Sequence, residues 1–207
     1  MTSTNPNSPK TFEDVTEFHG HVCPGSVLGF KAANLALREL SSEKSIDEKL
    51  VCMVENDSCA VDAIQVVTGC TFGKGNLIFN DFGKQTYTFI NRNSGEGVRV
   101  SMKKTFSMDN IDPELNVLRS KVSAGTASTQ EKEMLPEKVA EVTAKMLEMD
   151  GEEIFDAEKV KVEVPPRASL YKSVACDECG EMVSEHRVKK EGDNKLCIPC
   201  FESLSKE

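Results

Sequence analysis

The sequence has no excess of basic residues, because its 34 acidic side chains outnumber its 25 basic ones and give a formal net charge of −9 at pH 7. Nucleic-acid binding depends largely on basic side chains that neutralise phosphates, so this balance argues against a general nucleic-acid-binding protein. The sequence also lacks an apolar run of membrane-spanning length, and its polar residues 1–10 contain no apolar signal-peptide core. We therefore expect a cytoplasmic protein with a disordered tail at residues 1–10 and no membrane association.

Histidine is scarce, yet two of the three histidines lie in the single stretch 18–25. In an extended segment alternate side chains point the same way, so His19, His21 and Cys23 are expected to face one side. Cys23 is predicted to be a helix N-cap with Pro24 at the first helical position, where the positive end of the helix favours a thiolate. Imidazole and thiolate groups bind zinc and other transition metals, so this stretch predicts a metal site.

A second thiol is predicted to lie at the start of another helix. Residues 60–68 have a helical pattern, and Asp57 or the serine after it suits the N-cap. This placement puts Cys59 in the first helical turn, and Asp62 on the same face three residues later. If this helix start lies beside Cys23, then Asp57 or Asp62 could orient a histidine or act as a general base.

The thiols and imidazoles support several interpretations that the sequence leaves open. In the first, a metal ion is held by ligands from the set His19, His21, Cys23 and Cys59, with an open position for water or substrate. His21, Cys23 and Cys59 are the favoured ligands, and His19 is the one that could instead support a ligand from behind. In the second, the histidines cap the helix and the cysteines are small buried hydrophobes. In the third, Cys23 and Cys59 perform thiol redox chemistry without a metal.

Other cysteines and a lysine lie near these motifs. Cys52 falls within an apolar strand pattern and Cys70 follows the glycine that ends a helix, so we expect both to pack in the core. Lys74 lies in the glycine-rich turn 71–76, whose N–H groups and ammonium could bind an anion. A turn leading into a strand explains these glycines equally well.

Apolar periodicity and turn residues predict the remaining elements. The expected strands cover residues 50–54, 77–80, 85–91, 98–102 and 160–164, and the expected helices cover 25–40, 60–68, 113–122 and a segment from 128 onward. Ser128 fits a capping box at the start of the last helix, and Pro136 is expected to break or restart it. The strands expected at residues 85–91 and 98–102 are predicted to pair as a hairpin.

The C-terminal part contains two C-x-x-C pairs, Cys176–Cys179 and Cys197–Cys200, with 17 residues between the inner cysteines. This spacing is typical of a structural zinc site with four thiolate ligands. A module of this size builds little core, so the metal is expected to supply most of its folding free energy. His186 is expected to be a surface residue, because four sulfurs already complete the shell.

Two spaced motifs carry a family resemblance. The segment His19-Gly20-His21-x-Cys23-Pro24-Gly25 and the residues from Glu55 to Asn76 resemble the FmdE-like family, which is associated with molybdenum formylmethanofuran dehydrogenase. This resemblance implies an α+β core over residues 11–165, with a mixed sheet and packed helices. It also implies a treble-clef zinc finger over residues 166–207, a cysteine/histidine metal or active site, and homodimers.

The predicted function is that of a metal-binding protein linked to one-carbon or molybdenum-enzyme metabolism. Its expected cofactors are a structural zinc in the finger and zinc or another transition metal in the core, where a small anionic or pterin-like ligand would bind. The candidate catalytic residues are Cys23, Cys59, Asp57, Asp62 and Lys74. The alternative is a non-catalytic accessory protein whose finger docks onto a partner or a second copy. The resemblance implies a molybdenum-enzyme complex as a possible partner.

Overall fold

The computed structural model describes residues 9–40, 49–167 and 169–204. The first eight residues of the predicted disordered tail lie outside this range. The chain divides into two compact units, Met1–Pro166 and Arg167–Glu207, and each is described here by itself.

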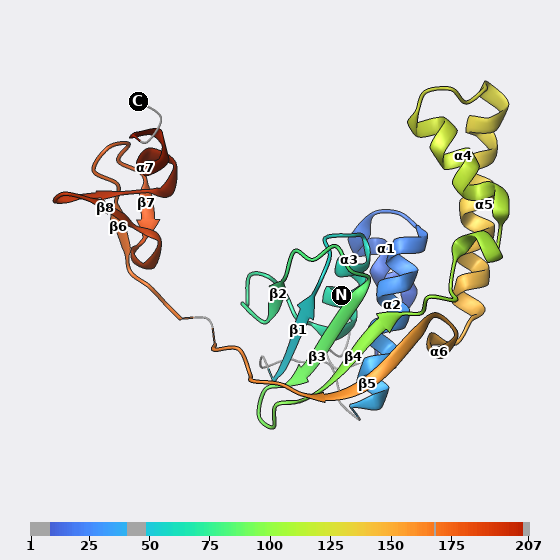
Figure 1. Ribbon diagram of the computed structural model, residues 1–207, viewed down its shortest axis with the longest axis horizontal. Coiled ribbons are helices and arrows are strands. Elements are labelled where there is room, and N and C mark those ends of the chain that lie inside the picture. Colours follow the sequence, from blue (N-terminus) through green and yellow to red (C-terminus); the bar gives the residue numbers. More distant parts are fainter. Residues whose placement is uncertain (1–8, 41–48, 168, 205–207) are drawn as a thin grey trace, which may run out of the picture. The chain divides into compact units, whose positions relative to one another are not determined.

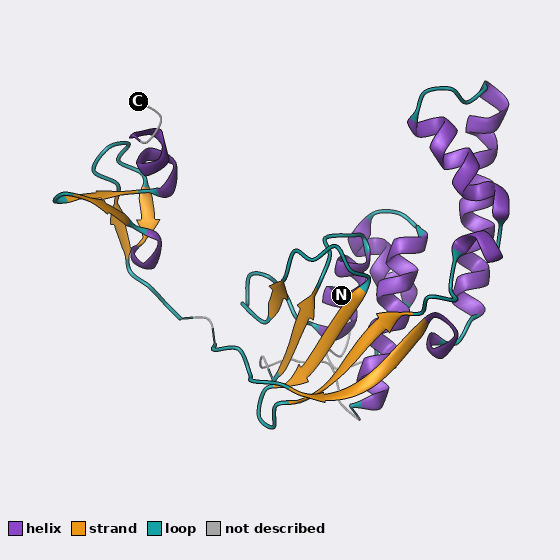
Figure 2. Ribbon diagram, in the orientation of Figure 1, coloured by secondary structure: helices purple, strands orange, loops and turns teal. Residues whose placement is uncertain are grey.

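The first unit is built on a five-stranded sheet with the strand order β2-β1-β3-β4-β5 (Figure 2). The strands are β1 (Leu50–Val54), β2 (Leu77–Phe79), β3 (Thr86–Asn91), β4 (Glu96–Met102) and β5 (Phe155–Lys161). Only β1 and β2 run parallel, while the other neighbouring pairs, including the predicted β3–β4 pair, are antiparallel. This mixed sheet with packed helices confirms the α+β fold.

Three helices lie together on one face of the sheet (Figure 1). They are α1 (Phe12–His19), α2 (Pro24–Glu39) and α3 (Ala60–Thr68). Helix α2 carries small and apolar residues on most of its surface, and its buried side chains belong to the hydrophobic core together with those of α3 and the sheet. Of the predicted site residues, His19 ends α1, His21 lies in the turn that follows, and Cys23 and Cys59 directly precede α2 and α3.

Two of the remaining helices, α4 (Pro113–Ser123) and α5 (Thr129–Glu148), form a pair that extends away from the sheet (Figure 1). The short helices η1 (Met108–Asn110) and α6 (Gly151–Ile154) precede and follow this pair in the chain. Ser128 and Glu131 form the predicted capping box. The predicted break at Pro136 is wrong, because α5 continues through it. Pro136 and Lys132 both reach the solvent, so water can bond the Lys132 carbonyl that proline leaves without a donor.

The last strand of the sheet starts and ends earlier in the sequence than its alternating pattern predicted. The strand predicted at residues 160–164 is instead β5, which starts at Phe155 and pairs along its length with β4. Phe155 is almost completely buried and directly follows the buried Ile154. Core packing at this end therefore fixes the strand, whereas the valines near residue 164 follow it.

The second unit is small and contains two short hairpins and a helix. Its elements are β6 (Ser173–Ala175), β7 (Met182–Ser184), η2 (Glu185–Arg187), β8 (Lys189–Glu191), β9 (Asn194–Leu196) and α7 (Ile198–Leu204). Strand β6 pairs with β7 and β8 with β9, both antiparallel. Across both units, none of the described helices combines the length and the apolar character needed to cross a membrane.

Candidate functional site

The four cysteines of the second unit converge on one point. Cys176 and Cys179 lie in the turn between β6 and β7, while Cys197 and Cys200 lie at the start of α7, and all four sulfur atoms are within 4.8 Å of one another. The backbone N–H of Cys197 donates to the Cys176 sulfur at 3.3 Å. Backbone N–H groups of Cys179 and Cys197 lower the pKa of Cys176 to about 6, which favours a thiolate. This donor set fits tetrahedral zinc.

His186 does not take part in this cluster. It is exposed, its ring stacks on Tyr171 with the centroids 3.9 Å apart, and its Nδ1 lies 2.9 Å from the Ser184 hydroxyl. The expected surface position is confirmed.

In the core, the first cluster of metal-ligating groups joins the end of α1 to the start of α2. One ligand atom each from His19, His21 and Cys23 lies within 4.8 Å of the other two. The predicted extended path is wrong, because His19 is the last residue of α1 and Gly20 ends that helix in the left-handed region with φ +88°. This φ suits glycine, which has no Cβ to clash, and the turn returns His21 towards His19, with the ring centroids 4.5 Å apart.

Cys23 is the N-cap of α2 with Pro24 at the first helical position, as predicted. Its sulfur accepts the Ser26 N–H at 3.4 Å and lies 3.7 Å from Nε2 of His19. Burial raises the pKa of the Cys23 thiol, but hydrogen bonds from Ser26, Cys59 and His19 outweigh burial and leave this pKa below its ordinary value. The helix start therefore favours the thiolate at Cys23.

Asp62 of α3 orients the His19 ring. Its carboxylate lies 2.7 Å from Nδ1 of His19, and Gln65 donates to its other oxygen at 3.5 Å. The hydrogen bond with Asp62 raises the pKa of His19. With Nδ1 held by a carboxylate, Nε2 points to the Cys23 sulfur, an arrangement common to metal-bound and catalytic histidines.

Cys59 lies beside this cluster without belonging to its closest set. A Cβ placed on Gly25 would lie 3.8 Å from the sulfur of Cys23 and 3.8 Å from that of Cys59, so the two thiols flank this glycine. Burial and the neighbouring Cys23 raise the pKa of Cys59. Helix α3 is bounded at Ala60, but Cys59 already has helical backbone angles, φ −52° and ψ −19°. The Ser58 hydroxyl accepts the Ala60 N–H at 3.4 Å, so Ser58 caps the helix and Cys59 lies at its start, as predicted.

A pocket of about 410 Å³ opens next to these groups. It is lined by His19, Val54, Asn56, Asp57, Ser58, Cys59, Val61, Asp62, Gln65, Phe72, Leu77 and Phe79. The structure therefore brings the predicted Cys59, Asp57 and Asp62 to the same cavity. Lys74 is not among the lining residues, and its ammonium bonds the carbonyl of Gly69 at the C-terminal end of α3.

Two aromatic lining residues were not predicted from the sequence. Phe72 is 80% exposed and Phe79 is 46% exposed. Phe72 could have been identified from the sequence, because a large aromatic residue in a glycine-rich turn is not needed to form the turn and therefore suggests a binding role. The buried Cys52 and Cys70 belong to the hydrophobic core, in keeping with the packing role expected for them.

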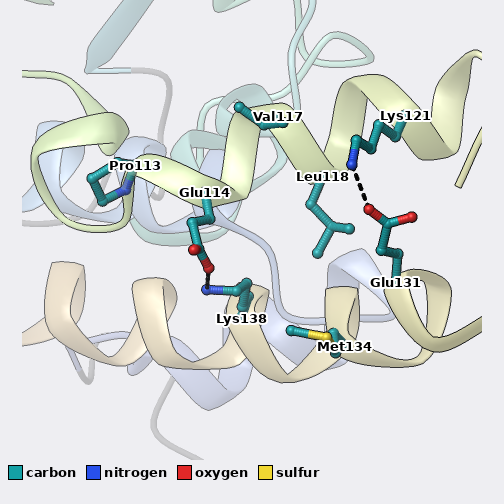
Figure 3. Close-up of a pocket in the computed structure, with 8 residues that line it drawn as sticks. All are labelled: Pro113, Glu114, Val117, Leu118, Lys121, Glu131, Met134 and Lys138. Carbon is teal, nitrogen blue, oxygen red and sulfur yellow. Dashed lines mark hydrogen bonds and ion pairs between the residues drawn. The ribbon is translucent and has the colours of Figure 1, made fainter. Parts of the chain in front are cut away.

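A second pocket, of about 290 Å³, lies between α4 and α5 (Figure 3). Its walls are Pro113, Glu114, Val117, Leu118, Lys121, Glu131, Met134 and Lys138. Lys121 and Lys138 each form an ion pair across it, with Glu131 and Glu114 respectively. It contains no histidine or cysteine, so it lacks the chemistry of the first pocket.

Comparisons with known proteins match both units of the chain. The FmdE family model, described as "Molybdenum formylmethanofuran dehydrogenase operon", matches residues 18–156. The model of the prokaryotic dksA/traR C4-type zinc finger matches residues 169–206. Together with the four converging sulfurs, this second match identifies the C-terminal unit as a structural zinc finger.

Two individual proteins are similar over most of this chain. A protein of Archaeoglobus fulgidus named "Probable S-adenosyl-L-methionine-binding protein" is 34% identical over 193 residues, which cover 89% of this chain and 50% of that protein. This chain thus spans about half the length of that curated relative. The crystal structure of a tungsten formylmethanofuran dehydrogenase FmdE-like protein from Syntrophus aciditrophicus matches with a TM-score of 0.60 and 24% identity, covering 98% of each chain. That likeness shows the fold.

Proposed function

The chain belongs to the FmdE family, and from that premise we propose that its core domain binds a transition metal, zinc or another, through His19, His21 and Cys23. The observation that carries this proposal is the convergence of their three ligand atoms within 4.8 Å. The family description supports a role in one-carbon or molybdenum-enzyme metabolism, and the need of such a site for reduced thiols supports a cytoplasmic location.

The surroundings of the three groups support a site open to a ligand. Three protein ligands leave one tetrahedral position for a further ligand, as in catalytic zinc sites. Asp62 holds His19 through Nδ1 at 2.7 Å, which leaves Nε2 as the ring nitrogen that would bind a metal ion. Cys59 flanks the same space and is either a fourth ligand or a thiol next to the bound small molecule.

A metal at this position would act as a Lewis acid or lower the pKa of a bound water. The protein groups around it divide the remaining tasks. His19 and Asp62 fix the geometry, while Asp57, exposed at the pocket, is placed to accept a proton from a ligand. Lys74 has no part in this scheme, because its ammonium is held at the end of α3.

The ligand and the partners are parts of the same proposal. The pocket is large enough for part of a pterin-like molecule or of S-adenosyl-L-methionine, which is the ligand in the name of the Archaeoglobus fulgidus relative. The family description supports association with a molybdenum enzyme. The zinc finger would dock onto that enzyme or onto a second copy of the chain.

Elemental analysis of the purified chain tests the core site. The proposal predicts about two metal ions per wild-type chain and about one in Cys23→Ser, with the finger still loaded. Cys179→Ser is the matched control, because it should lose the finger ion and keep the core ion. Circular dichroism shows whether each variant is folded. A folded wild-type chain with a single ion, retained in Cys23→Ser, would contradict the core metal site.

The placement of two thiols around Gly25 also favours a second candidate, a thiol–disulfide function. Oxidation would join the Cys23 and Cys59 sulfurs and pass two electrons and two protons to a small disulfide such as oxidised glutathione. Peptide mapping of the chain after a glutathione titration tests this function. A Cys23–Cys59 disulfide that forms reversibly in the metal-loaded chain supports it, whereas oxidation only after metal removal supports the metal site.

A further inference from the structure

The pocket beside the core cluster contains two acidic side chains among otherwise mostly neutral lining residues. Asp57 and Asp62 are among its twelve lining residues, and none of the twelve is a lysine or an arginine. In the metal-loaded site, the Cys23 thiolate and Asp62 would offset the two positive charges of the ion, which leaves Asp57 as the uncompensated charge of the pocket. The lining does not supply the cation that the sequence assigned to Lys74. Its charge favours a positively charged ligand.

The two carboxylates differ in what they already bind. Asp62 is engaged by His19 and Gln65. Asp57 is exposed, and its carboxylate has no hydrogen-bond or ion-pair partner within residues 9–40, 49–167 and 169–204. A cation in the pocket would therefore pair with Asp57 without displacing an existing contact.

Two phenylalanines of this pocket leave large ring surfaces in water. Phe72 is 80% exposed and Phe79 is 46% exposed, and both line the cavity. A phenylalanine ring stacks on a flat ligand ring, and its face also attracts a cation. Val54, Val61 and Leu77 add an apolar wall to the same cavity. These surfaces fit a flat organic body better than a hydrated inorganic ion.

We propose that this pocket binds an organic cation with a flat aromatic body, paired with Asp57 and stacked on Phe72. The assignment deepens the proposed function, on which it rests, because it names the class of ligand presented to the His/Cys cluster. It replaces the small anion expected from the glycine-rich turn.

Benzamidine and benzamide are suitable probes, because they have nearly the same shape and only benzamidine is cationic at pH 7. Their affinities for the metal-loaded full chain can be measured by NMR chemical-shift titration. We expect benzamidine to bind about tenfold more tightly, a difference of about 1.4 kcal/mol. Asp57→Asn should abolish this preference and leave benzamide binding unchanged, while Phe72→Leu should weaken both probes several-fold.

Two exposed neighbours outside the pocket lining provide matched controls. Asp81→Asn and Phe82→Leu make the same chemical changes and should alter neither affinity. The inference is overturned if benzamide binds as tightly as benzamidine, if neither probe binds at millimolar concentration, or if Asp57→Asn keeps the preference. Metal content is measured on the same samples. Two ions per chain without cation preference would refute the ligand class alone, and a single ion would refute the core metal site alone.

Discussion

Gly29 of α2 touches Ala60 of α3 so closely that no side chain fits between them. A Cβ on Gly29 would lie 2.0 Å from the Ala60 carbonyl oxygen, and one on Gly25 would lie 3.0 Å from the Cβ of Cys59. The two helices therefore cross where α2 carries Gly25 and Gly29. This crossing brings the start of α3, with Cys59, to the start of α2, with Cys23.

Gly29→Ala should destabilise the core domain by about 3 kcal/mol, because the new methyl group meets backbone that cannot move without separating α2 from α3. Gly73→Ala is the control, since a Cβ there would meet nothing within 4 Å. Its effect should stay within about 0.5 kcal/mol. Urea unfolding followed by circular dichroism measures both. Equal stabilities of the two variants would show that the helices do not cross as described.

The thiols flanking Gly25 should differ in reactivity once metal is removed. The pKa of Cys23 is lowered and that of Cys59 is raised. Iodoacetamide should therefore modify Cys23 first near pH 8, since the thiolate is the nucleophile. Mass spectrometry of the peptides after timed alkylation gives the rate at each site across pH. A Cys59 profile with its midpoint at or below that of Cys23 would contradict this order.

Much of the fold was predictable because its signals are local. The apolar run Leu50–Val54 is β1 itself, and the helix over residues 60–68 ends at Gly69 in the left-handed region, with φ +71°. Cys23 and Pro24 gave the start of α2 in the same way. Each prediction needed only a few neighbouring residues.

The errors arose where tertiary packing or solvent decided the outcome. Pro136 did not end α5, because exposure lets water replace the lost hydrogen bond. The valine alternation near residue 160 marked the end of β5, but its start depends on the burial of Phe155 against the core. No local pattern contains this information.

The candidate site was predicted as a set of residues and only partly as a geometry. His19, His21 and Cys23 do come together, but through a helix end and a left-handed Gly20 instead of an extended strand. Asp62 could not be chosen over Asp57 as the partner of His19 from sequence, since the choice depends on how α1 packs against α3.

Metal removal should unfold the zinc finger and leave the core folded. The buried residues of the finger's described part are only Cys176, Leu196 and Cys197, and so small a core cannot stabilise it without zinc. Cys179→Ser should therefore lose the dispersed NMR signals of residues 173–204 while the urea midpoint of the core stays within error. Met182→Ser, an exposed change in the same unit, should keep those signals. A dispersed finger spectrum in zinc-free protein would contradict the structural role of the metal.

Glu131 links the start of α5 to α4 in a way that depends on pH. Its carboxylate pairs with the Lys121 ammonium and accepts the Ser128 N–H at 2.8 Å (Figure 3 shows the pair). The hydrogen bond from Lys121, followed by those from Ser128, lowers the pKa of Glu131 from 4.5 to about 2. The folded pKa lies below the unfolded one, so this stabilisation is complete above the unfolded pKa of 4.5 and is lost as the pH falls towards about 2.

Glu131→Gln should consequently be less stable than wild type at pH 7, and the difference should shrink as the pH falls from 4.5 to about 2. Urea midpoints measured at several pH values test this trend. Glu133→Gln, a change at an exposed neighbour on the same helix, should show no such dependence. A Glu131→Gln difference that stays constant down to pH 2 would mean that Lys121 and Ser128 do not hold the ionised carboxylate, and that α4 and α5 are joined by their apolar contacts alone.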